Sequence, residues 1–296
     1  MRRRGRLALA AAAVATLGAM LIAPMASGQD GDNMLAVRSI DGTNQKDVKI
    51  TFLYTGAPDD LKSLVIREDG EAKKVTDLTN MSKTDQRLGT VYVVDLSGSM
   101  GDDGALGSVT DGLKEIAGSL PPGDEMAIVS FSNAPVVETA FTDNADQLNE
   151  AIDAMAAPSD GKTAMWDGIK RASELFVTRD DLQPNIVLIT DGVDDSSGTS
   201  FDDAKAAVIS AKAGLFAIEL DHTGEVDTES ISSIMDRAGG ASFTASKGKS
   251  TGAAFTSLAA TLQSQYVASY ASSVKQGQVD VTLSVGALER LSLIHI

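Results

Sequence analysis

The stretch from Val91 to Ser99 reads VYVVDLSGS, and it decides the class of fold. Its first four residues form a largely apolar run, which is typical of a parallel strand buried on both faces. The run ends in the acid Asp95, and hydroxyls follow at alternate positions, Ser97 and Ser99. We expect Gly98 to take a tight turn between the two hydroxyls. An acid at the end of a buried strand predicts a ligand site at one edge of an α/β sheet.

Strands and helices alternate from about Gly89 to Gln263, on both sides of this stretch. Further strands are expected at Met126–Phe131, Ile186–Ile189, Leu215–Leu220 and, more weakly, Ala241–Thr244. Amphipathic helices are expected at Thr110–Leu120, Ala145–Met155, Met165–Val177, Phe201–Lys212, Thr228–Ala238 and Gly252–Gln263. Such alternation implies right-handed crossovers. The predicted fold class is therefore α/β, with a doubly wound, mostly parallel, Rossmann-like sheet flanked by helices.

Shorter strands lie on both sides of this α/β region. They are expected at Val48–Tyr54, Leu64–Arg67, Glu71–Val75, Tyr266–Ser272 and Val279–Val285. The dipeptide Asp69-Gly70 is a strong signal for a two-residue hairpin turn. The last two strands cannot extend a parallel sheet without helices between them. We expect them to rejoin the N-terminal strands, so that the α/β domain is inserted in a smaller β-sandwich-like domain.

The first 28 residues have the layout of a secretory signal peptide. Four arginines precede an uncharged apolar run, and the small residues Ala26 and Gly28 prepare cleavage before Gln29. The alternative is an uncleaved anchor, because about 17 apolar residues is the lower limit for spanning a bilayer. Cleavage is favoured by the small residues. The sequence predicts an exported protein, extracellular or in the cell envelope.

The predicted domains follow from these patterns. The signal peptide covers 1–28, the first part of the β-rich domain 29–88, the α/β domain 89–264, and the returning strands 265–290. The last six residues, 291–296, end the chain without a turn or polar tail, and they match one frame of a transposon end used in sequencing libraries. We interpret them as an adapter artefact. Membrane contact is expected only through an uncleaved N-terminal segment or a C-terminal region missing after residue 290.

Composition excludes several classes of function. The 296 residues contain 25 Lys and Arg against 41 Asp and Glu, a net charge of −16. This charge repels phosphate backbones and argues against nucleic-acid binding. The absence of cysteine excludes disulfides, thiolate zinc sites and cysteine nucleophiles. With only His222 and His295, mechanisms that need several imidazoles are nearly excluded.

Polar residues follow two of the predicted central strands. Strand 186–189 ends in Thr190-Asp191-Gly192, and a turn-rich loop leads into Thr163 at a helix start. Loops at the carboxyl ends of adjacent strands meet in one crevice, so the oxygen donors can converge: Asp95, Ser97, Ser99, Thr163 and Asp191. These donors suit Mg²⁺, Mn²⁺ or Ca²⁺ better than zinc. Only two are anionic, so an open position on the metal would attract a carboxylate from another molecule.

These residues resemble the metal-ion-dependent adhesion site (MIDAS) of the von Willebrand factor A domain, in an exported bacterial type of protein. The motifs are Asp95-x-Ser97-x-Ser99, Thr163 in Gly-Lys-Thr-Ala-Met, and Thr190-Asp191-Gly192. The resemblance implies direct metal ligation by the three hydroxyls and mostly water-mediated ligation by the two acids. It implies a non-enzymatic module that binds a protein offering an Asp or Glu carboxylate. The alternative is a structural subunit of a cell-envelope or pilus/type II secretion-like complex.

Three other interpretations are weaker. Residues 156–163 formally match a relaxed P-loop, but a helical pattern precedes them and position 156 is Ala, which disfavours ATP binding. A serine hydrolase needs a base beside Ser97 or Ser99, and none is visible. The loop acids Asp102, Asp103, Asp194 and Asp195 indicate either a second cation site or, as we favour, solvated turns.

Overall fold

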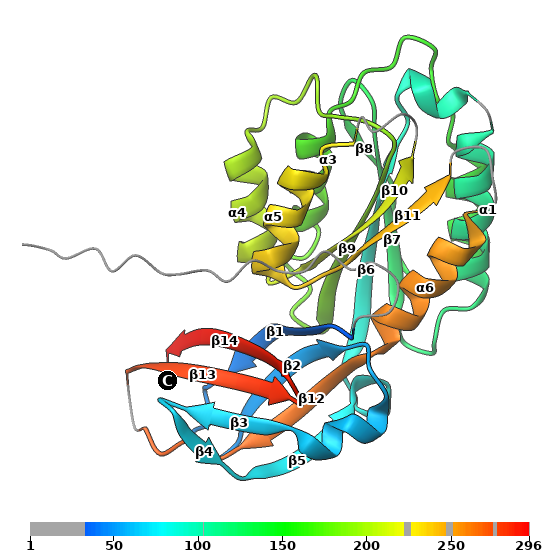
Figure 1. The fold of residues 1–296 in the computed structure, drawn as a ribbon. Helices are drawn as coiled ribbons and strands as arrows, with labels where there is room; N and C mark the ends of the chain where they lie inside the picture. The colour runs from blue at the N-terminus through cyan, green and yellow to red at the C-terminus, as the bar shows by residue number, and fades with distance from the viewer. Residues whose placement is uncertain (1–32, 103, 222–225, 247–250, 275–276, 296) are drawn as a thin grey trace, which may run out of the picture.

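The computed structural model describes residues 33–295 except 103, 222–225, 247–250 and 275–276. The predicted signal peptide and His222 lie outside the described residues. The chain forms an α/β unit, drawn at the top of Figure 1, and a β-sandwich, drawn below it. None of the helices in the described part of the chain combines the length and the hydropathy of a membrane span.

A six-stranded sheet forms the centre of the α/β unit, in the order β11-β10-β9-β6-β7-β8. Its strands are β6 (Arg87–Asp95), β7 (Glu125–Phe131), β8 (Pro135–Thr142), β9 (Leu182–Thr190), β10 (Gly214–Asp221) and β11 (Ser242–Ser246). All neighbours pair in parallel except β8, which pairs antiparallel with β7 at one edge. The predicted fold class is confirmed. The sequence does not predict β8, because this half-exposed edge strand lacks a continuous apolar run.

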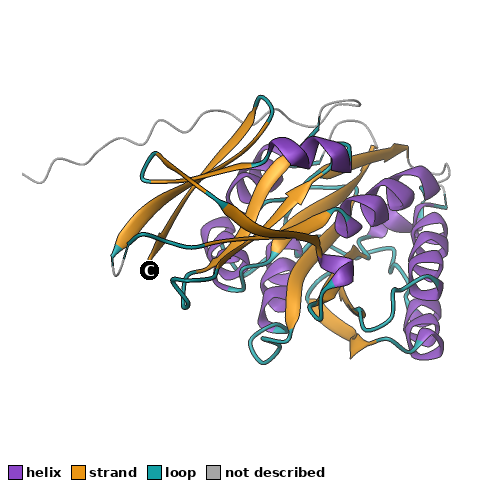
Figure 2. Ribbon diagram, turned by 90° about the horizontal axis from the view of Figure 1, so that it is seen from below, coloured by secondary structure: helices purple, strands orange, loops and turns teal. Residues whose placement is uncertain are grey.

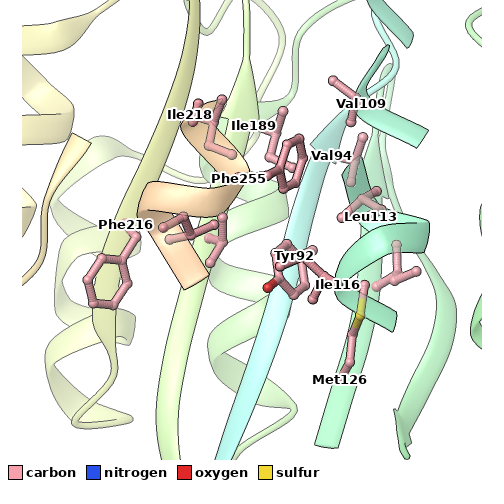
Figure 3. Packing of buried hydrophobic residues seen from close by; sticks show 14 of the residues in the cluster. Tyr92, Val94, Val109, Leu113, Ile116, Met126, Ile189, Phe216, Ile218 and Phe255 are labelled. Atoms are coloured by element: carbon pink, nitrogen blue, oxygen red, sulfur yellow. The ribbon is translucent and has the colours of Figure 1, made fainter. Parts of the chain in front are cut away.

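Helices cover both faces of this sheet. One face packs against α1 (Ala105–Gly118), α2 (Ala145–Ala154) and α6 (Gly252–Gln263), and the other against α3 (Met165–Glu174), α4 (Phe201–Ser210) and α5 (Thr228–Ala238). Figure 3 shows Leu113 of α1 and Phe255 of α6 packed over the sheet. A Cβ on Gly112 would lie 2.3 Å from the Phe255 ring, so glycine permits this approach of α1 and α6.

Helix α1 begins at Ala105, five residues before the predicted Thr110. Gly104 and Gly107 weaken the helical pattern in the sequence. The helix nevertheless begins at Ala105, because Ala105 and Val109 are completely buried against the sheet. Burial of an apolar face therefore decides where α1 starts, in preference to local propensity.

Two four-stranded sheets form the β-sandwich (Figure 2). One contains β1 (Leu35–Asp41), β2 (Val48–Tyr54), β12 (Gln265–Tyr270) and β5 (Val75–Asn80); the other contains β14 (Leu288–His295), β13 (Gln278–Val285), β3 (Val65–Glu68) and β4 (Glu71–Lys73). Short 3₁₀ helices, η1 (Pro58–Ser63) and η2 (Met81–Lys83), connect the strands. Each sheet therefore combines strands from before and after the α/β unit. The hairpin at Asp69-Gly70 is confirmed, with φ of 49° and 83°.

The sandwich meets the α/β unit where the parallel strands begin. The Arg38 guanidinium of β1 donates to the Pro184 carbonyl (2.8 Å) and to Asn185 Oδ1 (3.1 Å) in β9. Gln265 Nε2 donates to the same Asn185 oxygen at 3.2 Å. Arg38 also stacks over the Phe216 ring, 5.4 Å from its centroid. This junction leaves the opposite edge of the sheet, where β6 and β9 end, away from the sandwich (Figure 1).

Candidate metal-binding site

The chain order reverses between the two central strands, β6 and β9. β7 and β8 follow β6 on one side of the sheet, whereas β10 and β11 follow β9 on the other. Open α/β sheets bind ligands outside the carboxyl ends of the strands at such a switch point. β6 ends at Asp95, and β9 ends at Thr190, directly before Asp191. The two predicted acids therefore follow the two strands that flank this crevice.

Asp95 is completely buried at the end of β6. Its Oδ2 accepts a hydrogen bond from the Thr190 hydroxyl (2.7 Å), and its Oδ1 accepts one from the Ser97 amide (2.8 Å). Burial raises the pKa of Asp95 to about 6, against the effect of these hydrogen bonds and with a contribution from the charge of Asp191. In the part of the chain that the structure describes, no Lys or Arg forms an ion pair with Asp95.

The two serines connect this acid to the loop after β9. The Ser97 and Ser99 hydroxyl oxygens lie 3.1 Å apart, and the Ser99 hydroxyl donates to Asp191 Oδ1 at 2.9 Å. The expected tight turn is present: Gly98 begins a short 3₁₀ turn in which the Met100 amide donates to the Ser97 carbonyl at 3.0 Å, but the φ of Gly98 is not positive. Glycine is needed at this position for a close approach, because a Cβ on Gly98 would lie 2.8 Å from the Ser159 carbonyl oxygen.

Thr163 is buried in the loop before α3. Its hydroxyl oxygen lies 3.9 Å from the position that a Cβ on Gly192 would occupy, next to Asp191. Its amide donates to Asp195 Oδ1 at 2.8 Å, and its carbonyl accepts from the Asp195 amide at 3.0 Å. All five predicted residues therefore lie at one edge of the sheet. Hydrogen bonds link Ser97 to Asp95 and Ser99 to Asp191. The Thr163 hydroxyl lies near Gly192, the residue that follows Asp191.

Two further observations concern neighbouring residues. Residues 156–163 follow helix α2 rather than a strand, which is not the context of a phosphate loop. Asp194 and Asp195 are hydrogen-bond acceptors for backbone amides, Asp194 for that of Trp166 (3.2 Å) and Asp195 for that of Thr163. The sequence pattern does not predict this role. Ala164 was the available signal, because an alanine before α3 cannot cap the amides of its first turn.

A large cleft lies at the amino-terminal end of the sheet, between the sandwich and α5. The cleft has a volume of about 970 Å³, and Tyr54, Asp60, Asp236 and Arg290 are among its lining residues. None of the five predicted metal ligands lines it. The volume of a cleft therefore does not identify the candidate metal site. That site is identified by the chemistry of its oxygen donors.

The donors at the carboxyl edge fit a small, hard divalent cation. The described residues contain no group of three or more His, Cys, Asp or Glu side chains that could hold a metal. A cation at this edge therefore has to use hydroxyl oxygens together with the two carboxylates. A divalent cation would also offset the cost of burying Asp95 near a second negative charge, Asp191.

A comparison with models of known protein families agrees with the motifs around Asp95, Thr163 and Asp191. Residues 90–193 match the family described as von Willebrand factor type A domain. The chain contains a von Willebrand factor type A domain. The matched residues include all five candidate metal ligands of this A domain. A search of curated proteins gave no match.

Solved structures share the fold. A von Willebrand factor type A protein from Catenulispora acidiphila is 13% identical with a TM-score of 0.54, and the match covers 90% of this chain and 72% of that one. Proximal thread matrix protein 1 from the mussel byssus, with a zinc-occupied MIDAS motif, is 19% identical with a TM-score of 0.54. That match covers 64% of this chain and 48% of the mussel chain, so this chain spans about half its length. At these identities the likeness concerns the fold alone.

Proposed function

We propose that this A domain is an exported protein-binding module that holds a divalent cation at Asp95, Ser97, Ser99, Thr163 and Asp191. The observation that carries the proposal is the buried Asp95 carboxylate. It has no Lys or Arg partner in the described part of the chain, and it lies beside a linked set of hydroxyl and carboxylate oxygens. A cation beside a carboxylate buried in this way would offset the cost of its burial.

Each residue has a distinct part in this proposal. The three hydroxyls of Ser97, Ser99 and Thr163 are the direct ligands, and the carboxylates of Asp95 and Asp191 act mostly through water. The Thr190 hydroxyl fixes one oxygen of Asp95. The hard oxygen donors favour Mg²⁺, followed by Mn²⁺ and Ca²⁺. The zinc-occupied MIDAS motif of the mussel protein supports a divalent cation at a site of this type.

The partner is proposed to be a protein that offers an Asp or Glu carboxylate. When bound, the cation supplies an open coordination position for that carboxylate. The neutral hydroxyls leave much of its positive charge uncompensated. The chain has a net charge of −16, so an acidic partner is repelled unless a cation is present. The site lies at the edge of the sheet opposite the sandwich, where a partner can approach (Figure 1). Export itself is supported by residues 1–28.

The proposal is tested by water-proton relaxation with Mn²⁺ on the chain without residues 1–28. Bound Mn²⁺ that keeps an exchangeable water enhances relaxation, and acetate, a carboxylate probe, is expected to displace this water and lower the enhancement. Thr163→Ala and Asp191→Ala are expected to abolish saturable binding while the far-ultraviolet circular dichroism stays unchanged. Absence of saturable Mn²⁺ binding to the wild type would refute the proposal. Binding that acetate does not affect favours the alternative, a structural subunit whose cation has closed coordination.

A further inference from the structure

Two segments at the carboxyl edge are hydrogen-bonded to each other in both directions. One runs from Thr163 to Asp167 and leads into α3; the other runs from Asp194 to Thr199, after β9. The Asp195 carboxylate accepts from the Thr163 amide (2.8 Å), and the Asp195 amide donates to the Thr163 carbonyl (3.0 Å). Asp195 therefore holds both backbone polar groups of a candidate metal ligand.

The first turn of α3 is capped by this second segment. Amides in the first turn of a helix lack partners within the helix, and Ala164 before α3 offers no side-chain acceptor. Asp194 Oδ1 accepts from the Trp166 amide at 3.2 Å, and the Ser197 hydroxyl accepts from the Asp167 amide at 3.1 Å. Ser197 in turn donates to Asp194. The cap of α3 thus comes from a loop about thirty residues later in the chain.

Asp167 binds the second segment from the helix side. Its carboxylate accepts from the amides of Gly198 (2.9 Å) and Thr199 (2.8 Å). Burial alone would raise the pKa of Asp167, but hydrogen bonds from Thr199 and Gly198 outweigh it and hold the pKa below its usual value. The contacts therefore run in both directions and tie the start of α3 to the loop that follows Asp191.

We infer that Asp195 is a positioning residue for Thr163, and that the contacts of Asp194, Ser197 and Asp167 support it. This inference rests on the proposed function. Thr163 and Asp191 belong to segments far apart in the sequence, and Asp195 sets the distance between them. Its carboxylate acts as a hydrogen-bond acceptor for an amide, not as a ligand of a second cation. Residues that orient metal ligands in this way contribute strongly to metal affinity.

Two substitutions at position 195 separate geometry from charge. Asp195→Asn keeps an acceptor oxygen for the Thr163 amide but removes the negative charge, whereas Asp195→Ala removes both. We expect Asp195→Ala to weaken Mn²⁺ binding by about 10- to 100-fold in calorimetric titrations. Asp195→Asn is expected to keep an affinity close to that of wild type, as is Asp102→Asn. Asp102, an exposed acid three residues after Ser99, is the matched control for loss of charge.

Amide hydrogen exchange supplies a readout that needs no metal. In a chelator, Asp195→Ala is expected to accelerate exchange at the Thr163 and Trp166 amides, whereas Asp195→Asn is not. Unchanged Mn²⁺ affinity in Asp195→Ala overturns the inference, and so does equal weakening by Ala and Asn, which would indicate an effect of charge. If the wild type binds no Mn²⁺, the proposed function fails. Positioning is then decided by exchange, and unchanged exchange at Thr163 overturns it.

Discussion

Two carboxylates are completely buried in different parts of the molecule, and their surroundings are opposite. Glu68 lies in the sandwich at the end of β3, 1% exposed, with its Oε2 3.2 Å from Lys73 Nζ. It also accepts hydrogen bonds from the Ser272 hydroxyl and from the amide and hydroxyl of Ser273. Burial alone would raise the pKa of Glu68, but the hydrogen bonds from Ser272, Ser273 and Lys73 lower it below its usual value.

Asp95 in the A domain accepts hydrogen bonds from Thr190 and Ser97 and, among the described residues, forms no ion pair with Lys or Arg. Burial consequently raises its pKa to about 6. The buried acid of the sandwich, Glu68, has its counter-charge within the protein, in Lys73, and its role is structural. In the proposed function, the buried acid of the A domain receives its counter-charge from a cation bound from solution.

The largest expected effect on the free energy of unfolding comes from removing Glu68, the partner of Lys73 in the sandwich. Glu68→Ala leaves Lys73 almost buried without its main partner and removes the acceptor of several donors. We expect a loss of about 3–5 kcal/mol in the free energy of unfolding, measured with urea. Glu71→Ala is the control, because Glu71 contacts the same lysine but is 79% exposed; its expected cost is below about 0.5 kcal/mol. Equal losses in the two variants would contradict this view of Glu68.

Removing the charge of Asp95 in the A domain is expected to change the free energy of unfolding in the opposite direction. Asp95→Asn removes a buried charge and keeps an acceptor for the Ser97 amide. In a chelator at pH 7, we expect a free energy of unfolding equal to wild type or up to about 2 kcal/mol higher. Urea unfolding provides the measurement. A variant less stable than wild type by more than about 1 kcal/mol would mean that Asp95 already has its counter-charge within the protein.

Acidification is expected to distinguish the two acids again. The pKa of Asp95 is raised when folded, so the folded state binds the extra proton and its stability rises as pH falls through about 6. Without metal, wild type should gain about 1 kcal/mol relative to Asp95→Asn between pH 7 and pH 5. The lowered pKa of Glu68 acts the other way and only below its ordinary value of 4.5, outside this interval. A constant difference between the two proteins across this interval contradicts the prediction.

The smallest effect on stability is expected from a hydroxyl at the metal edge. Ser99→Ala removes one hydrogen bond to Asp191 at a partly exposed position, at a cost of about 0.5–1 kcal/mol. Mn²⁺ affinity is expected to fall by about tenfold or more, because a direct ligand is lost. Ser82→Ala in the sandwich removes a comparable hydroxyl and should leave Mn²⁺ affinity unchanged. Titration calorimetry on both variants provides the comparison, and equal affinities would remove Ser99 from the ligand set.

The sequence predicts the parts of the fold that depend on local pattern. Apolar runs such as 186–189 indicate the buried strands, and the doubly wound order places the ends of β6 and β9 together. The edge strand β8 and the early start of α1 are not predicted, because one has little apolar pattern and the other is decided by burial of Ala105 and Val109. Local pattern therefore predicts the core elements better than the edges.

The candidate site shows the same division. The motifs around Asp95 and Asp191 predict which residues converge, since their strands are neighbours. The acceptor roles of Asp194 and Asp195 are not predicted, because they depend on amides from a segment about thirty residues away. The tight turn at Gly98 is confirmed, but a second constraint on this glycine is not predicted, for a similar reason. This second constraint is a contact with the Ser159 carbonyl, which only the folded chain creates.

The need of Asp95 for a cation is tested most directly by calorimetric titration of the chain without residues 1–28 with Mg²⁺, Mn²⁺ and Ca²⁺. Asp95→Asn is compared with wild type, and Glu71→Ala is the control for loss of a negative charge elsewhere. We predict saturable binding at one site in wild type and in Glu71→Ala, and none in Asp95→Asn. No binding by wild type, or equal binding by Asp95→Asn, would contradict the account.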